Sequence, residues 1–404
     1  EGINYDGNHF VKNAMKNGAK FSIVSDPEVN YEGTILVGSG RESLIKIASR
    51  IREKFQPKVI AITGSNGKTT TKEIIVSILK NYCDKEQILF TKGNFNNDIG
   101  LPLTMLDLNK SHKYVVLELG MNHAGEIADL SKIAQPHVAV ITNIGEAHIE
   151  NFKSKYNIAE AKKEILSHSS KLEFAVLPSD DYYFTFLNEG GSNLNKVTFG
   201  SLEESTISYK ASEDRKIKIV TPKESFNVKI NLLGTHNLQN VLAACACCYS
   251  LGIPVHAIKI GIEEIKPFPG RLEAISAVKG ATVIDDSYNA NPSSMKEAID
   301  VLLLMKGTRI LVIGDMAELG DDTNKYHQEL GDYIQASKID FTLAIGRHTK
   351  LTMQQLGKKE FWFDSKDALV SKLLKVMDSK STVLVKGSRF MKMEDIVNKL
   401  KVEK

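Results

Sequence analysis

The run Val59-Ile-Ala-Ile-Thr63, followed by Gly64-Ser-Asn-Gly-Lys-Thr-Thr70, decides the fold of this chain. The first five residues are almost entirely apolar, which is typical of a strand buried on both faces of a parallel sheet. The next seven predict a phosphate-binding loop, because glycines let backbone N–H groups approach phosphate oxygens. A helix over residues 71–81 is expected to follow, and its N-terminus favours a bound anion.

This loop is a shortened form of the full Walker pattern, which would place a glycine where the chain has Ile62. Lys68 is expected to reach the β- and γ-phosphates of ATP, and the Thr69 hydroxyl to bind Mg²⁺. The remaining loop residues are expected to complete the nucleotide site: Gly64, Ser65, Asn66, Gly67 and Thr70. The alternative, a plain Gly-Lys-Thr turn at a helix start, is disfavoured by the flanking strand and helix.

The pattern of strands and helices predicts three α/β domains, over residues 1–56, 57–268 and 269–404. Further apolar strands over 114–119 and 137–143 predict a parallel sheet in the central domain. Residues 171–232 are expected to append an antiparallel portion to it. Two prolines and a glycine in Lys266-Pro-Phe-Pro-Gly-Arg271 end this pattern. A second doubly wound domain is expected beyond them, with strands over 282–285, 309–313, 341–345 and 383–386.

Composition limits the partners that the chain requires. Of its 404 residues, 42% are hydrophobic and 25% charged, which suits sizeable globular cores. The formal net charge of +3 is spread thinly, so neither nucleic acid nor an anionic membrane is expected as a partner. No apolar run approaches the roughly 20 residues that span a bilayer. The four cysteines are Cys83, Cys245, Cys247 and Cys248. The last three fall in an apolar stretch that predicts a buried helix. This placement favours packing in a reducing compartment over disulfides.

Two polar residues lie at or just after the ends of neighbouring predicted strands. Glu118 lies at the end of the strand over 114–119, and His148 follows the strand over 137–143 after a short loop. Ligands of open parallel sheets bind at the carboxyl ends of the strands. We therefore expect Thr69, Glu118 and His148 to offer a hydroxyl, a carboxylate and an imidazole to one metal ion. The alternatives are a solvated carboxylate at a strand end and an ordinary loop histidine.

Further motifs extend along most of the chain. Together with Thr63-Gly-Ser-Asn-Gly-Lys-Thr69 they resemble those of the Mur ligase family, whose members build the peptide of peptidoglycan. They are Asn94-Phe-Asn-Asn-Asp-Ile-Gly-Leu-Pro102, Glu118-Leu-Gly-Met-Asn-His-Ala-Gly-Glu126, Asn143-Ile-Gly-Glu-Ala-His148, Gly234-Thr-His-Asn-Leu-Gln-Asn240, Pro269-Gly-Arg-Leu-Glu273, Asp285-Asp-Ser-Tyr-Asn-Ala-Asn-Pro292, Gly314-Asp-Met-Ala-Glu-Leu-Gly320 and Val385-Lys-Gly-Ser-Arg389. The segments 288–292 and 314–320 resemble the branch that adds D-alanyl-D-alanine (D-Ala-D-Ala).

The resemblance implies an ATP- and Mg²⁺-dependent ligase that joins D-Ala-D-Ala to UDP-N-acetylmuramoyl-tripeptide, acting as a cytoplasmic monomer. It implies an N-terminal domain for the UDP-sugar, a central ATPase domain and a C-terminal domain that brings the amino component. Residues 1–10 resemble the middle of the UDP-binding domain, so part of that domain is expected to be missing from the sequence.

Site residues follow from the same resemblance. Lys68, Glu118 and His148 are implied in catalysis together with Lys162, which occupies the position of a carbamoylated, metal-binding lysine. The alternative for Lys162 is a solvated helix lysine, and Lys163 stands where the family has glycine. The implied adenine contacts are His236, Asn237 and Asn240, and the groups that close onto ATP are Arg271 and Asp286. The implied substrate contacts are Asn96, Asn97, Tyr288, Asn289 and Asn291.

Four alternatives to this function are disfavoured by the sequence. A folylpolyglutamate synthase shares the phosphate loop, but segment 288–292 speaks against it. A GTPase-like switch needs an Asn-Lys-x-Asp motif, which neither Asn13-Ala-Met-Lys16 nor Asn324-Lys-Tyr-His327 provides. A dinucleotide site would need Gly-x-Gly-x-x-Gly after the first strand of the C-terminal domain, and that pattern is absent there. The last alternative is an inactive scaffold, against which the intact Lys68, Glu118 and His148 argue.

Overall fold

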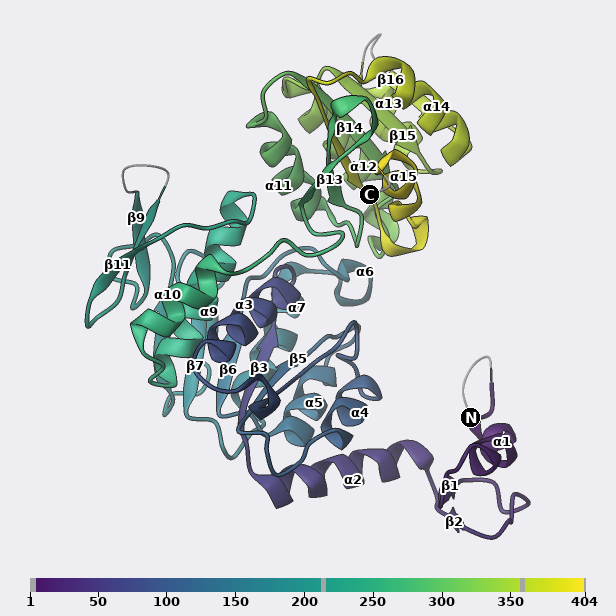
Figure 1. Cartoon of the computed structure of the whole chain (residues 1–404), viewed down its shortest axis with the longest axis vertical. Helices are drawn as coiled ribbons and strands as arrows, with labels where there is room; N and C mark the ends of the chain where they lie inside the picture. The colour runs from purple at the N-terminus through teal and green to yellow at the C-terminus, as the bar shows by residue number, and fades with distance from the viewer. Residues whose placement is uncertain (1–4, 212–215, 357–359, 403–404) are drawn as a thin grey trace.

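The computed structural model describes residues 5–211, 216–356 and 360–402. Two large α/β bodies are stacked on one another, and a small N-terminal lobe stands apart from both (Figure 1). We call the two bodies the central domain and the C-terminal domain. Each is built on a sheet in which six described strands are paired.

The central sheet is parallel throughout and has the strand order β4-β5-β3-β6-β7-β8. In β3 the side chains alternate between the faces, so that Ile60 and Ile62 enter one core while Val59 and Ala61 enter the other. This two-sided burial explains why the strand is a continuous apolar run. The strands are β3 (Lys58–Thr63), β4 (Ile88–Phe90), β5 (Tyr114–Glu118), β6 (Val138–Ile141), β7 (Phe174–Pro178) and β8 (Asn195–Phe199).

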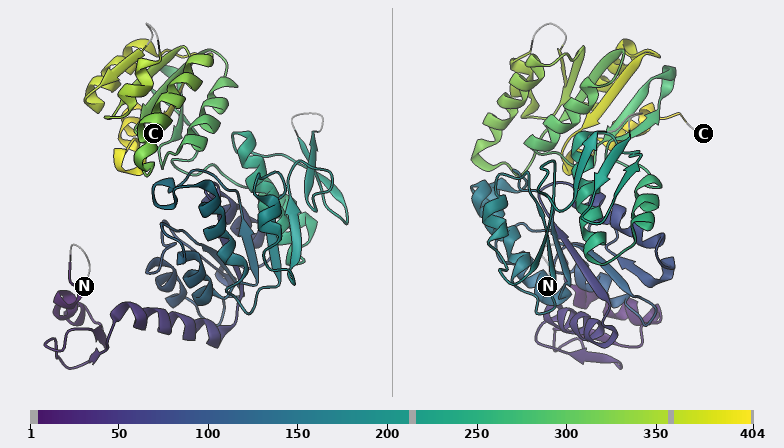
Figure 2. Two further views of the ribbon diagram at one scale, coloured as in Figure 1. Left: turned by 180° about the vertical axis from the view of Figure 1, so that it is seen from behind. Right: turned by 90° about the vertical axis from the view of Figure 1, so that its left-hand side faces the viewer.

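Helices cover both faces of this sheet (Figure 2). One core is closed by α3 (Lys68–Lys80), α9 (Thr235–Ser250) and α10 (Val255–Glu263). The other is closed by α2 (Gly40–Phe55), α4 (Gly100–Leu106), α5 (Glu126–Ala134), α6 (Ile149–Phe152), α7 (Lys155–Lys163) and α8 (Phe184–Asn188). The predicted cysteine-bearing helix is therefore confirmed: it is α9, and its three cysteines are fully buried.

The prediction for residues 171–232 was wrong in its first part. β7 and β8 do not form an antiparallel appendage but extend the main parallel sheet, since β7 pairs with both β6 and β8. Only the later strands form a separate antiparallel sheet: β9 (Ser208–Ala211), β10 (Ile217–Val220) and β11 (Ser225–Val228). Residues 212–215 of the predicted portion lie outside the described residues.

The C-terminal sheet has the order β12-β13-β17-β14-β15-β16 and is mixed rather than wholly parallel. The unpredicted strand β12 (Glu273–Ser276) runs antiparallel to β13 (Thr282–Asp286) at one edge. The others are parallel: β14 (Thr308–Gly314), β15 (Phe341–Ile345), β16 (Glu360–Phe363) and β17 (Ser381–Lys386). One face carries α11 (Pro292–Leu303), α12 (Thr323–Ala336) and α13 (Thr349–Gln354), and the other α14 (Lys366–Val376) and α15 (Glu394–Leu400).

The N-terminal lobe is joined to the central domain through α2 (Figures 1 and 2). It contains α1 (Val11–Lys16) and the parallel strands β1 (Ser22–Val24) and β2 (Thr34–Leu36). Residues 1–4 of the segment that resembles a UDP-binding domain lie outside the described residues. Among the helices that the structure describes, none combines the length and the apolarity needed to cross a membrane.

Candidate active site

A cleft lies between the central and C-terminal domains, where the carboxyl ends of the central strands face the second sheet. Its lining contains the loop after β3, Glu118 at the end of β5, and His148 after β6. The rest of the lining comes from the start of α9, beside the loop, and from the C-terminal domain. The residues that it contributes include Asn237, Asn240, Arg271, Asp286, Tyr288, Asn289, Asn291, Glu297, Glu318 and Lys386.

The loop between β3 and α3 has the shape of a phosphate-binding loop. Gly67 has a φ of 78°, and a Cβ atom at this position would collide with Oδ1 of Asn240. The position therefore favours glycine on both conformational and steric grounds. Lys68 curls over the loop, and its Nζ donates to the carbonyl oxygen of Gly64 at 2.7 Å. Desolvation lowers the pKa of Lys68, an effect that the nearby Glu118 carboxylate opposes.

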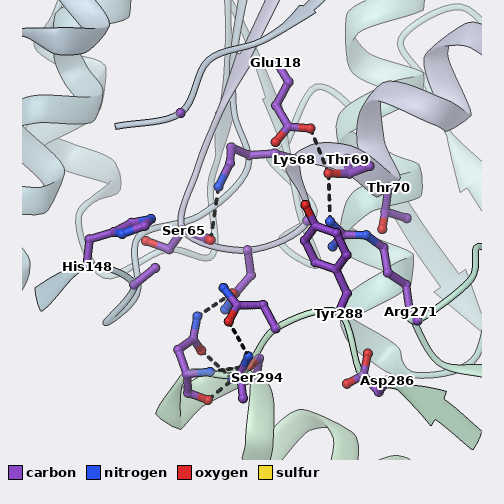
Figure 3. A pocket seen from close by; sticks show the side chains of 18 of the residues that line it. Ser65, Lys68, Thr69, Thr70, Glu118, His148, Arg271, Asp286, Tyr288 and Ser294 are labelled. Carbon is purple, nitrogen blue, oxygen red and sulfur yellow. Dashed lines mark hydrogen bonds between the residues drawn. The ribbon is translucent and has the colours of Figure 1, made fainter. Parts of the chain in front are cut away.

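Glu118 is the centre of a polar network at the end of β5. Thr69 Oγ1 donates to its Oε2 at 2.8 Å, and Asn96 Nδ2 donates to its Oε1 at 2.8 Å. Arg271 joins the network from the other side of the cleft, because its guanidinium donates to Thr69 Oγ1 at 2.9 Å (Figure 3). The ring of Tyr288 stacks on the same guanidinium, with 4.2 Å between Arg271 Cζ and the ring centroid. The network joins residues that are 202 positions apart in the sequence.

The donor atoms at this network suit a hard cation. The Glu118 carboxylate is only 4% exposed, and it lies beside a hydroxyl oxygen, which is the ligand chemistry that Mg²⁺ prefers. His148 lines the same cleft, but its Nδ1 lies 2.7 Å from Oε2 of Glu318 in the C-terminal domain. Lys68 lies between His148 and the Thr69–Glu118 pair in Figure 3. Among the described residues, no three His, Cys, Asp or Glu side chains form a ready metal cluster.

Lys162 lies in the last turn of α7 and is 2% exposed. The alternative of a solvated helix lysine is therefore wrong. Within the described part of the chain, its Nζ makes no hydrogen bond or ion pair, and it does not line the cleft directly. Burial holds the pKa of Lys162 well below its usual value, and the charge of Lys68 lowers it further. The neighbouring Lys163 instead packs over the ring of Phe186.

The expected adenine residues lie at the start of α9. Asn240 Nδ2 donates to Asn237 Oδ1 at 2.9 Å, and Asn237 Nδ2 donates to the carbonyl oxygen of Leu233 at 2.6 Å. These bonds fix the two amides beside Gly67 of the phosphate loop. His236 lines the same wall, and its burial, together with the charge of Lys386, lowers its pKa to about 4. The imidazole is therefore neutral near pH 7.

Lys386 and Asp286 form an ion pair on the C-terminal side of the cleft, and only Asp286 was predicted as a site residue from the sequence. Lys386 Nζ lies 2.6 Å from Asp286 Oδ2 and donates to the carbonyl oxygen of Asn289 at 2.8 Å. Burial raises the pKa of Asp286, and the charge of Lys386 opposes this shift. Lys386 and Glu318 were missed as site residues, although each lies in a segment that resembles the family: 385–389 and 314–320.

On the central side of the cleft, Asn97 Oδ1 accepts from the backbone N–H of Gly100 at the start of α4.

The site therefore consists of a phosphate loop at the carboxyl edge of a parallel sheet, and Arg271 and Asp286 of a second α/β domain face this loop. This arrangement is typical of a nucleotide-dependent enzyme. The family described as "Mur ligase middle domain" matches residues 62–248, and "Mur ligase, glutamate ligase domain" matches residues 270–389. A UDP-N-acetylmuramoyl-tripeptide–D-alanyl-D-alanine ligase from Haemophilus influenzae is 35% identical over 99% of this chain and 89% of its own length.

Solved structures agree with this match. MurF from Acinetobacter baumannii superposes with a TM-score of 0.92 at 35% identity, covering 99% of this chain and 88% of that one. MurF from Thermotoga maritima, solved in complex with ADP, gives a TM-score of 0.87 at 30% identity, covering 98% and 92%. The chain belongs to the Mur ligase family, in its MurF group.

Proposed function

We propose that this chain is an ATP- and Mg²⁺-dependent ligase that adds D-Ala-D-Ala to UDP-N-acetylmuramoyl-tripeptide in the cytoplasm. The observation that supports it most is the network in which Arg271 of the C-terminal domain meets Thr69 and Glu118 beside Lys68. The named relatives span nearly the whole chain and carry this activity in their names. The proposal divides the chain into the domains 1–56, 57–268 and 269–404.

The proposed reaction has two steps. The terminal carboxylate of the tripeptide attacks the γ-phosphorus of ATP, which gives an acyl phosphate and ADP. The amine of D-Ala-D-Ala then attacks the acyl carbon, and phosphate leaves from a tetrahedral intermediate. Both steps concentrate negative charge on oxygen atoms, which the ammonium of Lys68 and the guanidinium of Arg271 are placed to stabilise. The main work of the protein is therefore to position reactants and stabilise charge.

The metal proposal rests on the oxygen atoms of Thr69 and Glu118, with His148 as a further ligand from the same cleft. Bound Mg²⁺ would neutralise charge on the phosphate oxygens. Lys162 is proposed to act as its carbamate, which supplies the carboxylate that a metal site needs. Burial lowers the pKa of the Lys162 amine and so favours its neutral form, which is the form that reacts with CO₂.

The remaining site residues are assigned to the ligands by the part of the cleft that they line. We assign the adenine to His236, Asn237 and Asn240, and the ATP phosphates and ribose to residues 64–70, Arg271 and Asp286. Substrate contacts are assigned to Asn96 and Asn97 on the central wall and to Tyr288, Asn289 and Asn291 on the C-terminal wall. All of these residues except Gly64 are among those that line the cleft.

Phosphate release tests the reaction with each candidate amino component. We expect phosphate and ADP to form with UDP-N-acetylmuramoyl-tripeptide and D-Ala-D-Ala, and not when L-Ala-L-Ala or L-glutamate replaces the dipeptide. Turnover of a folate substrate with L-glutamate would instead favour the folylpolyglutamate synthase alternative.

Magnesium dependence tests the metal ligands. We expect Glu118→Ala and His148→Ala to raise the Mg²⁺ concentration at half-maximal activity by about tenfold or more, since each removes one ligand. Asp129→Ala, which removes an exposed carboxylate on α5, is the matched control. A Mg²⁺ dependence that stays unchanged in both site variants would show that the two side chains are structural.

A further inference from the structure

The phosphate loop and the C-terminal domain are joined through the side chain of Asn66. Its Nδ2 donates to Ser293 Oγ at 3.0 Å, and its Oδ1 accepts from Asn291 Nδ2 at 2.8 Å. Both partners lie at the start of α11, more than 220 positions further along the chain. Asn66 itself lies only two residues before Lys68. We call this set of three side chains the Asn66 bridge.

The backbone of Asn66 is fixed from the central side. Its N–H donates to Asn143 Oδ1 at 2.9 Å, while its carbonyl oxygen accepts from Thr142 Oγ1 at 2.6 Å and from Asn143 Nδ2 at 3.1 Å. Both partners follow β6. With its backbone held by one domain and its amide by the other, Asn66 has little freedom to move independently of either.

Asn291 is fixed just as firmly. It is the N-cap of α11, and its Oδ1 accepts from the backbone N–H of Ser294 at 2.9 Å. Ser294 Oγ in turn accepts from the backbone N–H of Asn291 at 3.0 Å, which completes a capping box. Both polar atoms of the Asn291 side chain therefore have protein partners, one in the cap and one in the bridge. The same residue orients α11 and binds the phosphate loop.

Packing around the bridge is tight. A Cβ atom on Gly145 would lie 3.3 Å from Ser293 Oγ and 3.4 Å from Ser65 Cβ. The two domains therefore lie close together here, and even a methyl group at position 145 would require its neighbours to shift by a few tenths of an ångström.

We propose that Asn66 and Asn291 are positioning residues that set the C-terminal domain in register with the phosphate loop. The loop that places Lys68 at the γ-phosphate also fixes α11 and, just before it, the segment from Tyr288 to Asn291. On the proposed ligase reaction, this segment brings the dipeptide amine to the acyl phosphate, and small errors in such an approach are costly in rate. The bridge acts through other groups and touches no reacting atom.

Asn66→Ala and Asn291→Ser test the bridge. Serine is a good N-cap, so Asn291→Ser keeps α11 capped but is too short to reach Asn66. The matched control is Ser294→Ala, which removes the capping-box partner and leaves the contact between Asn66 and Asn291 in place. Kinetics with wild-type substrates and small-angle scattering with a non-hydrolysable ATP analogue are the two readouts.

Each bridge variant is expected to lower kcat/KM for D-Ala-D-Ala by about 5- to 30-fold, the loss that one or two net hydrogen bonds produce. In Asn291→Ser, which leaves the phosphate loop intact, the KM for ATP should change by less than about twofold. The double variant should lose no more activity than the more impaired single variant, because the two side chains act as one unit. Losses that multiply in the double variant, or that Ser294→Ala reproduces, would overturn the proposal.

The kinetic test of the bridge rests on the proposed ligase activity, but small-angle scattering does not. Scattering therefore distinguishes a failure of this inference from a failure of the proposed function. With the ATP analogue alone, the wild type and Ser294→Ala should reach the same radius of gyration. Asn66→Ala and Asn291→Ser should remain larger on average, because the contact that sets the domain register is lost. If both bridge variants become as compact as the wild type, the bridge does not position the domains.

Discussion

Two lysines beside the phosphate loop show how burial prepares a side chain for chemistry. Desolvation lowers the pKa of both Lys68 and Lys162, and their mutual repulsion adds to the effect at Lys162. Lys68 also has the Glu118 carboxylate nearby, which favours its charged form. Lys162 has no such partner among the described side chains. The two residues therefore suit different roles, a cation for Lys68 and a neutral amine for Lys162.

Lys68→Met should abolish ADP formation while the protein stays folded. The ammonium supplies charge to the phosphates rather than packing, so we expect a loss of at least 10²-fold in kcat. Circular dichroism should match that of the wild type, and the melting temperature should not fall. ADP formation at the wild-type rate would remove Lys68 from the phosphate site.

If Lys162 acts as its carbamate, as proposed, Lys162→Ala should be nearly inactive and partly rescued by acetate, since a small carboxylate would replace the carbamate. Chloride at equal ionic strength is the control. Full activity without the side chain would disprove the carbamate. Rescue by both anions alike would show a salt effect only.

The stability of Lys162 variants gives an independent test of the pKa shift. Because its pKa is lower in the folded protein, the unfolded chain binds more protons below the ordinary lysine pKa of about 10.4, so the lysine destabilises the fold there. In CO₂-free buffer, Lys162→Met should therefore raise the melting temperature at pH 7. The gain should shrink as the pH approaches 10. A gain that is independent of pH would mean that packing, not charge, is responsible.

Among the secondary structure elements, α9 illustrates how completely the central core is filled. Cys245, Cys247 and Cys248 lie in it without exposed surface, and burial raises the thiol pKa of Cys245 to about 12. Cys83, after α3, is half-buried. Because thiolates are the reactive form, a thiol reagent at pH 8 should modify at most Cys83 in the native protein and all four cysteines in guanidinium chloride. Rapid native modification of two or more thiols would show that α9 opens readily.

Most of these elements could be predicted because their sequences carry local signals. β3 and β5 are apolar runs next to polar turns, and β15 was predicted with its observed bounds. Short edge strands carry weaker signals, and β12 and β16 were missed for that reason. β7 was assigned to an antiparallel portion because its own five residues do not reveal which strand will lie beside it.

The site was predictable to a similar extent. Strand ends placed Glu118 beside the loop correctly, since β3 pairs Ile62 with Glu118. The contacts of Asn66 with Asn291 and of His148 with Glu318 were not predicted. They join segments that are 170 to 225 positions apart, and they depend on how one folded domain rests on another, which no local pattern records.

For the whole molecule, the contacts described across the cleft are mainly polar: Arg271 with Thr69, the Asn66 bridge, and His148 with Glu318. Polar interfaces between domains of one chain are typical of domains that move relative to each other. The two domains are connected by a single extended segment at residues 266–270, between α10 and β12 (Figure 1). Tyr288 N–H donates to the carbonyl oxygen of Gly270 at 3.1 Å, which ties the end of this segment to the C-terminal domain.

We therefore expect the C-terminal domain to rotate about the Pro267–Gly270 segment, with a more open average form without ligands than with them. ATP phosphates held at Lys68 would add a charged partner for Arg271 of the C-terminal domain, and that contact exists only when the domains are close. Closure would also exclude water, which otherwise hydrolyses an acyl phosphate. Small-angle scattering should show a smaller radius of gyration with an ATP analogue and UDP-N-acetylmuramoyl-tripeptide than without. Lys68→Met should compact less at the same ligand concentrations. An identical radius of gyration in an active enzyme with saturating ligands would rule out the hinge, since the cleft would then have its working shape before any substrate arrives.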